Sequence, residues 1–331
     1  MSNIVYVFSN GVFSRHNNTI LFESKEGEKK YIPVENTKEI FVFGEVDFNK
    51  RFLEFLSQKE IVLSYFNYYG YYMGSFYPRE HNNSGHILMQ QVLFYQNTEK
   101  RLVLAKKFVF GASENCLKNL KYYSRRGRNL VVKIEIIEKL IEKIKEQDDI
   151  IKLMAIEGQI KKNYYNCFNE IINNNEFSFT KRTKRPPLDY INSLISFSNS
   201  IIYNLVLSEI YKTHLDPRIG FLHSTNNRGF SLNLDVAEIF KPIIGDRVIF
   251  TVLNKNIIDE NSFENNNQEI YLNEIGKKKF LEQFEIKVNR AISHSSFKKN
   301  HSFKRIISSE LYKLEKHFDE KIDYKPFIVN W

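Results

Sequence analysis

The hydrophobic pattern of the chain changes near residue 80. Before this point, short apolar runs are closed by turn residues, which is typical of strands, and one stretch at 49–57 places Phe52, Leu53 and Leu56 on a helical face. From Ile87 onward, apolar residues recur at helical spacing. The sequence therefore predicts an α+β fold, with a small N-terminal β-sheet or β-sandwich domain at 1–80 and a larger all-α domain at 86–331.

Turn residues place two features in the N-terminal part. Asn10-Gly11 separates two apolar runs and predicts a β-hairpin between them. Farther along, tyrosines at 68, 69, 71 and 72 surround Gly70. These rings either form a platform on which nucleic-acid bases stack or belong to a hairpin whose rings cover a sheet core or an interface. The hairpin is favoured, because aromatic rings more often fill such surfaces.

The helical part contains one strongly periodic segment, 148–172. Its apolar stripe consists of Leu153, Ile156, Ile160, Tyr164, Cys167 and Ile171. The pattern also predicts a helix from Ile87 with a break near Gly111. Pro187 is expected to start a later helix that has Asp189 near its positive N-terminal end.

The remaining segments give simpler predictions. The asparagine-rich stretch 255–271 indicates a loop without regular structure. The last helices are expected from about Lys277 to His317, and the apolar, aromatic tail at 324–331 is expected to pack against another part of the protein.

Composition narrows the class of protein. The net charge is +9 and the pI is near 9.2, which is compatible with a polyanionic partner. Only Cys116 and Cys167 occur, neither in a metal-binding cluster, so a disulfide framework or structural zinc is not expected. No charged-then-apolar leader and no long uncharged apolar run is present. We therefore expect a cytoplasmic protein that makes no membrane contact.

The densest positive run lies at 181–185 and is called the basic loop below. It carries Lys181, Arg182, Lys184 and Arg185 in a polar segment that ends in two prolines. Such a loop is either solvated charge or a contact to the DNA backbone, because phosphates are what basic loops engage without reading sequence.

The stretch from Gly220 to Pro242 carries the candidate chemistry. His223 precedes a glycine-bearing loop, and Asp235 and Glu238 follow with helical spacing, so both carboxylates would lie on one face. Two carboxylates that face a histidine can hold a magnesium or manganese ion. In the alternative interpretation, Asp235 and Glu238 form a helix-capping pattern and His223 is a core or loop histidine.

Three motifs resemble a known family. HLDPRIGFLHSTNNRGFSLNLDVAEIFKP, IEGQIKKNYYNCF and KRPPLDYINSLISFSNSIIYN are similar to the signature blocks of the CRISPR-associated adaptation integrase, the Cas-one family, and occur in the family's order. The resemblance covers nearly the whole chain and points to a type I system. One departure is Lys162, where the family usually has an arginine, so the charge is kept but bidentate phosphate geometry is lost.

The resemblance implies a metal-dependent DNA endonuclease and integrase. Glu157, His223 and Glu238 would bind Mg²⁺ or Mn²⁺, and Asp235 would act beside them as a fourth catalytic residue. The reaction implied is attack by the 3′-hydroxyl of protospacer DNA on a phosphodiester at the CRISPR repeat, with water in its place giving hydrolysis. Lys162 and the basic loop would contact DNA.

The same resemblance implies partners, and two other functions stay open. The partners are double-stranded DNA (protospacer and repeat), a second copy of the chain bound through the β domain, and a Cas-two dimer. One alternative is a different metal-dependent nuclease with the same ligands. The other is a non-catalytic DNA-binding scaffold in which Asp235 and Glu238 cap a helix.

Overall fold

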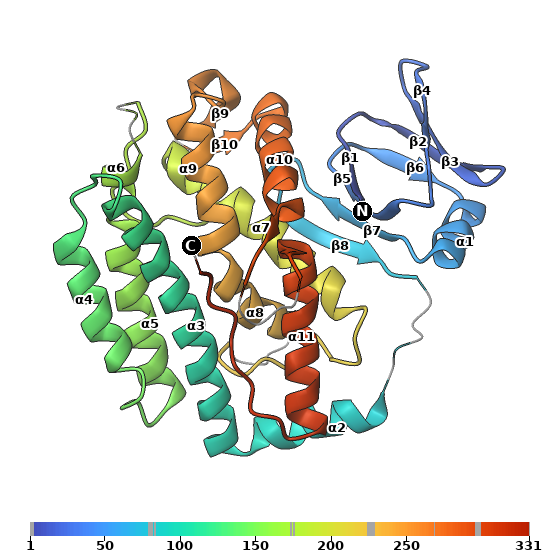
Figure 1. The fold of residues 1–331 in the computed structure, drawn as a ribbon. Helices are drawn as coiled ribbons and strands as arrows, with labels where there is room; N and C mark the ends of the chain where they lie inside the picture. The colour runs from blue at the N-terminus through green and yellow to red at the C-terminus, as the bar shows by residue number, and fades with distance from the viewer. Residues whose placement is uncertain are drawn as a thin grey trace. The chain divides into compact units, whose positions relative to one another are not determined.

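The computed structural model describes residues 3–78, 82, 84–172, 174, 176–223, 229–267, 269–294 and 299–330. The chain divides into two compact units, 1–83 and 84–331, where the sequence predicted domains at 1–80 and 86–331. The first is rich in strands and the second is mostly helical, which confirms the predicted fold class (Figure 1).

In the described part of the N-terminal unit, the chain forms two four-stranded sheets and one helix (Figure 1). The first sheet has the order β1 (Asn3–Val7), β5 (Thr37–Val42), β7 (Val62–Phe66) and β8 (Tyr72–Phe76), and only its last pair is antiparallel. The second has the order β4 (Lys29–Ile32), β3 (Thr19–Ser24), β2 (Gly11–His16) and β6 (Val46–Phe48). Apolar side chains of both sheets share one core with α1 (Lys50–Lys59), which confirms the helix predicted at 49–57. The side chain of Asn49 caps its first turn.

The predicted hairpin at Asn10-Gly11 is wrong. β2 pairs with β3 across a turn at Asn17, which adopts φ +53°. Gly11 lies in β2 instead, where an added Cβ would stand 2.3 Å from the carbonyl oxygen of Glu23. A glycine is therefore required here because the two strands pack closely. In the sequence alone, this requirement cannot be told from a glycine in a turn.

The tyrosine-rich segment is a hairpin between β7 and β8, as favoured. Gly70 lies in its turn with φ +83°, a conformation that glycine adopts without strain. Tyr68 and Met73 are 64% and 59% exposed, and Tyr65 is 49% exposed. These side chains therefore lie on the surface of the unit rather than in its core.

The second unit is built around the buried helix α7 (Tyr190–Ile210), which contacts α8 (Leu232–Phe240) and α11 (Phe303–Asp319). Its other helices are α2 (Gly85–Gln96), α3 (Thr98–Ser124), α4 (Val131–Glu142), α5 (Ile150–Tyr165), α6 (Phe168–Ile171), α9 (Arg247–Asn254) and α10 (Glu274–Asn289). After Lys241, which ends α8, a π-helix η1 (Pro242–Asp246) leads directly into α9. Within the described residues, none of the helices is long and apolar enough to cross a membrane.

Three predictions for this unit need correction. The break near Gly111 is wrong, because α3 runs through it and the chain breaks at Asn97 instead. The helix after Pro187 begins only at Tyr190, and Asp189 is its cap, accepting from the Asn192 N–H at 2.7 Å. The segment 255–271 is not an irregular loop, since it contains η2 (Glu260–Ser262) and a hairpin of β9 (Phe263–Asn266) and β10 (Glu269–Leu272).

A further short antiparallel pair is formed by β11 (Ala291–Ile292) and β12 (His301–Ser302).

The C-terminal tail packs against α3 and α11, as expected. Asn115 donates to the Phe327 carbonyl at 3.0 Å and accepts from the Val329 N–H at 2.9 Å. Glu310 accepts from the Tyr324 hydroxyl at 2.5 Å. At Gly111 an added Cβ would stand 2.6 Å from Pro326, so this glycine lets the tail approach α3.

Candidate active site

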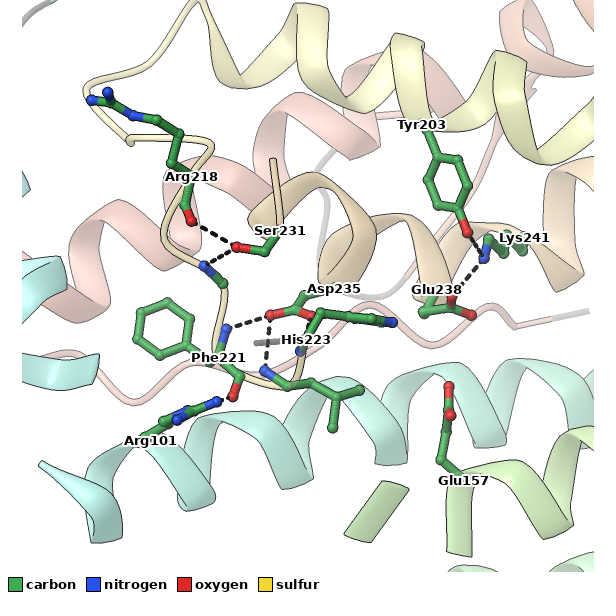
Figure 2. A network of polar contacts seen from close by, with 12 residues as sticks. Arg101, Glu157, Tyr203, Arg218, Phe221, His223, Ser231, Asp235, Glu238 and Lys241 are labelled. Carbon is green, nitrogen blue, oxygen red and sulfur yellow. Dashed lines mark hydrogen bonds and ion pairs between the residues drawn. The ribbon is translucent and has the colours of Figure 1, made fainter. Parts of the chain in front are cut away.

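The loop that carries His223 is fixed to the start of α8. Ser231 accepts from the Gly220 N–H at 2.8 Å and donates to the Arg218 carbonyl at 2.7 Å (Figure 2). A Cβ at Gly220 would stand 2.7 Å from the Ser231 carbonyl carbon, so the residue must be glycine for the two segments to touch. Residues 224–228, which follow His223, lie outside the described part of the chain.

Asp235 organises this loop from inside α8. One carboxylate oxygen accepts from the N–H groups of Phe221 and Leu222 at 2.6 and 3.0 Å. The other accepts from the His223 N–H at 3.0 Å and is 2.7 Å from His223 Nδ1 (Figure 2). The carboxyl is fully buried. With four such contacts, Asp235 holds the loop and the imidazole in place.

This arrangement fixes the proton on the imidazole. A carboxylate only accepts hydrogen bonds, so Nδ1 of His223 is the donor and Nε2 carries the lone pair of the neutral ring. Burial alone would lower the pKa of His223, but its hydrogen bond to Asp235 and the nearby negative charges of Asp235, Glu238 and Glu157 raise it. The ring extends from Asp235 toward Glu238 (Figure 2).

The capping interpretation of Asp235 and Glu238 is wrong. α8 begins at Leu232, its flanking residue is Ser231, and no side-chain cap is present there. The carboxylate of Asp235 binds the 221–223 backbone, not the first N–H groups of its own helix. Glu238 likewise points to lysines, as described next.

Two glutamates from different helices meet at one ammonium group. Lys161 on α5 donates to Glu238 Oε2 at 2.5 Å and forms an ion pair with Glu157, one turn earlier on the same helix. The other oxygen of Glu238 accepts from Lys241 at 2.5 Å. Lys241 is fixed in turn by the hydroxyl of Tyr203, whose ring centroid lies 4.4 Å from its Nζ.

The electrostatics of this cluster depend on the lysines. Burial alone would raise the pKa of Glu238, yet the ammonium groups of Lys161 and Lys241 outweigh it and hold the pKa well below its usual range. Conversely, burial would lower the pKa of Lys161, but Glu238 and Glu157 raise it. Burial would likewise lower the pKa of Lys241, but Glu238 raises it, so Glu238, Lys161 and Lys241 all stay charged at neutral pH.

The structure thus links Glu157 to Glu238 through Lys161 and His223 to Asp235, and Asp235 and Glu238 lie on the same helix, α8. Figure 2 shows the carboxylate of Glu157 pointing from α5 toward α8 and the histidine ring. Lys162, expected to contact DNA, is exposed on α5, and its neighbour Lys161 is the residue that reaches the carboxylates.

Sequence reasoning missed Lys161, Lys241 and Tyr203. The two lysines carry a signal, since they follow Glu157 and Glu238 by four and three residues, the spacing of helical ion pairs. Tyr203 carries none, because only the packing of α7 against α8 brings it to Lys241.

The four cations of the basic loop have different environments. Arg182 is half-buried and donates to Asn192 Oδ1 at 2.8 Å and Ser196 Oγ at 3.0 Å, so its guanidinium fixes the loop to α7. Lys181, Lys184 and Arg185 are exposed. Although the Lys184 residue is exposed, desolvation by the protein around its ammonium, and then the positive charges of Arg182, Lys161 and Lys241, lower its pKa. Lys184 therefore lies within electrostatic range of the centre.

The donor set suits a hard divalent cation. Glu157 and Glu238 already converge on a single cation, and His223 offers Nε2 from a ring whose other nitrogen is bound by a carboxylate, the arrangement usual for metal-ligating histidines. As the described side chains stand, no three acidic, histidine or cysteine groups converge on a shared ion position. The Lys161 ammonium lies between the two glutamates, so the residues fit a metal once that ammonium moves.

The chain combines a strand-rich unit with a helical unit that holds two glutamates at one lysine and a histidine at an aspartate, and these features point to its family. The chain belongs to the Cas1 family, because the model described as CRISPR associated protein Cas1 matches residues 5–286. It is 51% identical over 331 residues to CRISPR-associated endonuclease Cas1 2 of Thermodesulfovibrio yellowstonii, covering 100% of both chains. It is 43% identical over 328 residues to CRISPR-associated endonuclease Cas1 of Clostridium perfringens, covering 98% of each.

Solved structures share the fold. A Cas1 protein from Thermotoga maritima superposes with a TM-score of 0.86 at 42% identity, covering 99% of both chains. A casposase bound to integration product superposes with a TM-score of 0.89 at 18% identity, covering 98% of this chain and 93% of the other, a likeness of fold alone. The family resemblance is confirmed, and type I stays a prediction.

Proposed function

We propose that this protein is a metal-dependent DNA endonuclease and integrase of CRISPR adaptation. The observation that carries the proposal is the convergence of Glu157 and Glu238 on one cation, beside an imidazole whose orientation is fixed by Asp235. Relatives that carry the name endonuclease cover the full chain at up to 51% identity, which supports a nuclease activity.

In this proposal Glu157, His223 and Glu238 hold Mg²⁺ or Mn²⁺. The bound ion would neutralise charge on the scissile phosphate and help to activate the attacking oxygen. Asp235 keeps the histidine proton on Nδ1, so that Nε2 faces the centre with its lone pair. Lys241 is held by Tyr203 next to Glu238 and supplies a fixed positive charge beside the reacting phosphate.

The substrate in this proposal is DNA, and the nucleophile decides the product. Attack by a protospacer 3′-hydroxyl on a repeat phosphodiester joins the two DNA strands, whereas attack by water cleaves the strand. The exposed cations of the basic loop and Lys162 would contact the DNA backbone. Lys184 lies within electrostatic range of Lys161, Lys241 and Glu238 and would hold a phosphate near the centre.

The partners belong to the same proposal. A chain of this fold, 15% identical, is part of the solved Cas6-RT-Cas1–Cas2 complex, and this supports Cas2 as a partner, which would bind as a dimer. A second copy of the chain would bind through the N-terminal unit, where Tyr65, Tyr68 and Met73 are exposed around the edge strand β8.

The test is strand transfer into a supercoiled plasmid that carries a CRISPR repeat. Glu157→Gln should reduce transfer at least about a hundredfold, because a ligand of the metal is lost while the shape is kept. The matched control is Glu170→Gln, an exposed glutamate on α6, which should transfer like the parent. A duplex that lacks the 3′-hydroxyl should abolish joining and leave cleavage by water. Full transfer by Glu157→Gln would contradict the proposal.

A further inference from the structure

Lys161 occupies the place between the two glutamates that face His223. Its ammonium contacts one oxygen of Glu157 and one of Glu238, and the Glu238 contact is 2.5 Å. One oxygen of Glu157 and one oxygen of Glu238 therefore lie on the same nitrogen, the Nζ of Lys161. A protein cation already lies where the two carboxylates could share an ion.

The two lysines of the cluster are held differently. Lys241 is 9% exposed and is fixed by Tyr203, so it has a second anchor besides Glu238. Lys161 is 28% exposed, and its ammonium is held by the two carboxylates themselves. Because a lysine ammonium stands on a flexible four-carbon stem, Lys161 can turn to solvent without any movement of α5.

We propose that Lys161 is an internal counter-ion that competes with the divalent metal for Glu157 and Glu238. The inference rests on the proposed metal centre and assigns a role to a residue outside its ligand set. An ammonium group and a divalent ion placed between the same two carboxylates would overlap and repel each other, so the two compete for this position. Metal binding therefore requires that Lys161 leave, and the affinity of the site includes the free energy of breaking both contacts.

The counter-ion also has a structural effect when no metal is bound. The carboxyl side chains of Glu157 and Glu238 are only 14% and 6% exposed, so their charges need a nearby cation. Lys161 supplies it from one turn along α5 and ties that helix to α8. Without Lys161 the two carboxylates would repel each other, and a divalent ion would relieve more repulsion than it does in the parent.

The experiment compares Mn²⁺ binding to the full-length parent and to Lys161→Gln by titration calorimetry. The variant should bind Mn²⁺ roughly tenfold more tightly, the scale of a typical coupling between two ligands. Lys145→Gln is the matched control, since it removes the same charge from an exposed position outside the site and should bind like the parent. Lys161→Arg keeps the internal cation and should also remain at the parent affinity or weaker.

Thermal melting gives a second readout that does not depend on catalysis. In EDTA, Lys161→Gln should melt below the parent, and Mn²⁺ should raise its melting temperature more than it raises that of the parent. A variant that folds only in Mn²⁺ would support the same conclusion. Equal Mn²⁺ affinity in Lys161→Gln and the parent, or equal stabilisation by Mn²⁺, would overturn the inference. If neither protein binds Mn²⁺, the proposed metal centre is refuted, and the proposed role of Lys161 is refuted with it.

Discussion

Replacing Asp235 with asparagine should destabilise the helical unit strongly, although the shape of the side chain is nearly kept. In the parent, each carboxylate oxygen accepts two hydrogen bonds, one pair from Phe221 and Leu222 and the other from His223. An asparagine has one acceptor oxygen and one amide group that only donates. In the better orientation the amide oxygen keeps the bonds from Phe221 and Leu222, and the His223 N–H loses its acceptor. Nδ1 of His223 then keeps a bond only by accepting from the amide, after its proton has moved to Nε2.

The magnitude follows from this count. Leaving the one buried donor without an acceptor costs about 1–3 kcal/mol, and the two bonds from Phe221 and Leu222 lose about 1 kcal/mol each when their acceptor becomes neutral, so the total is roughly 3–5 kcal/mol. For a unit of this size, a change of 1 kcal/mol in the free energy of unfolding shifts the melting temperature by about 2–4 °C. The melting temperature of Asp235→Asn should therefore fall by about 10 °C.

The assay is thermal melting followed by far-UV circular dichroism at pH 7 in EDTA. Asp149→Asn is the matched control, because Asp149 caps α5 through one oxygen, at 2.8 Å from the Lys152 N–H, and asparagine caps equally well. Its melting temperature should be close to that of the parent. If Asp235→Asn also melts within about 2 °C of the parent, the role of Asp235 in holding the 221–223 backbone is refuted.

Three further predictions concern charge and packing. Burial raises the pKa of Asp246 to about 7, against an ordinary value of 3.8, so the ionised carboxyl destabilises the fold fully above pH 7, progressively less between these values, and not at all below pH 3.8. In urea unfolding, the stability of Asp246→Asn relative to the parent should therefore increase as the pH rises from 4 to 8. A difference that does not change with pH would contradict this. Serine at the three exposed positions of the basic loop should flatten the plot of log DNA affinity against log salt by up to about 0.9 per lost duplex phosphate contact, whereas Arg182→Ala should mainly lower the melting temperature; an unchanged slope in the triple variant would mean that the loop is solvated charge. Gly158→Ala, where no atom lies within 4 Å of an added Cβ, should stabilise α5 by about 0.5–1 kcal/mol, whereas Gly220→Ala should cost about 1–3 kcal/mol by overpacking, and equal melting of the two would contradict the geometry.

Local patterns in the sequence predicted those parts of the site that depend on one segment. The helical spacing of Asp235 and Glu238 was sufficient to place both on α8, and the motif around Glu157 placed it on α5. Whether Asp235 binds metal, caps a helix or holds a loop depends on which backbone N–H groups fold over it. That information lies in the path of residues 220–223, which periodicity does not describe.

The parts that could not be predicted depend on contacts between distant segments. Lys161 and Glu238 are 77 residues apart in sequence, and only the packing of the helical unit brings their side chains together. Gly11 and Gly111 were misread for a related reason. Each glycine allows a close approach by another segment, and the sequence does not distinguish this from a turn or a helix break.

The central claim is that Glu157, His223 and Glu238 hold one divalent ion. The most direct test is a titration of Mn²⁺ followed by the electron paramagnetic resonance signal of the free ion, with the parent, Glu157→Gln, His223→Ala and Glu238→Gln measured under the same conditions. We predict one tightly bound ion per parent chain and an affinity at least about tenfold weaker in each variant, because each loses one ligand. Parent-like Mn²⁺ binding by all three variants would contradict the account.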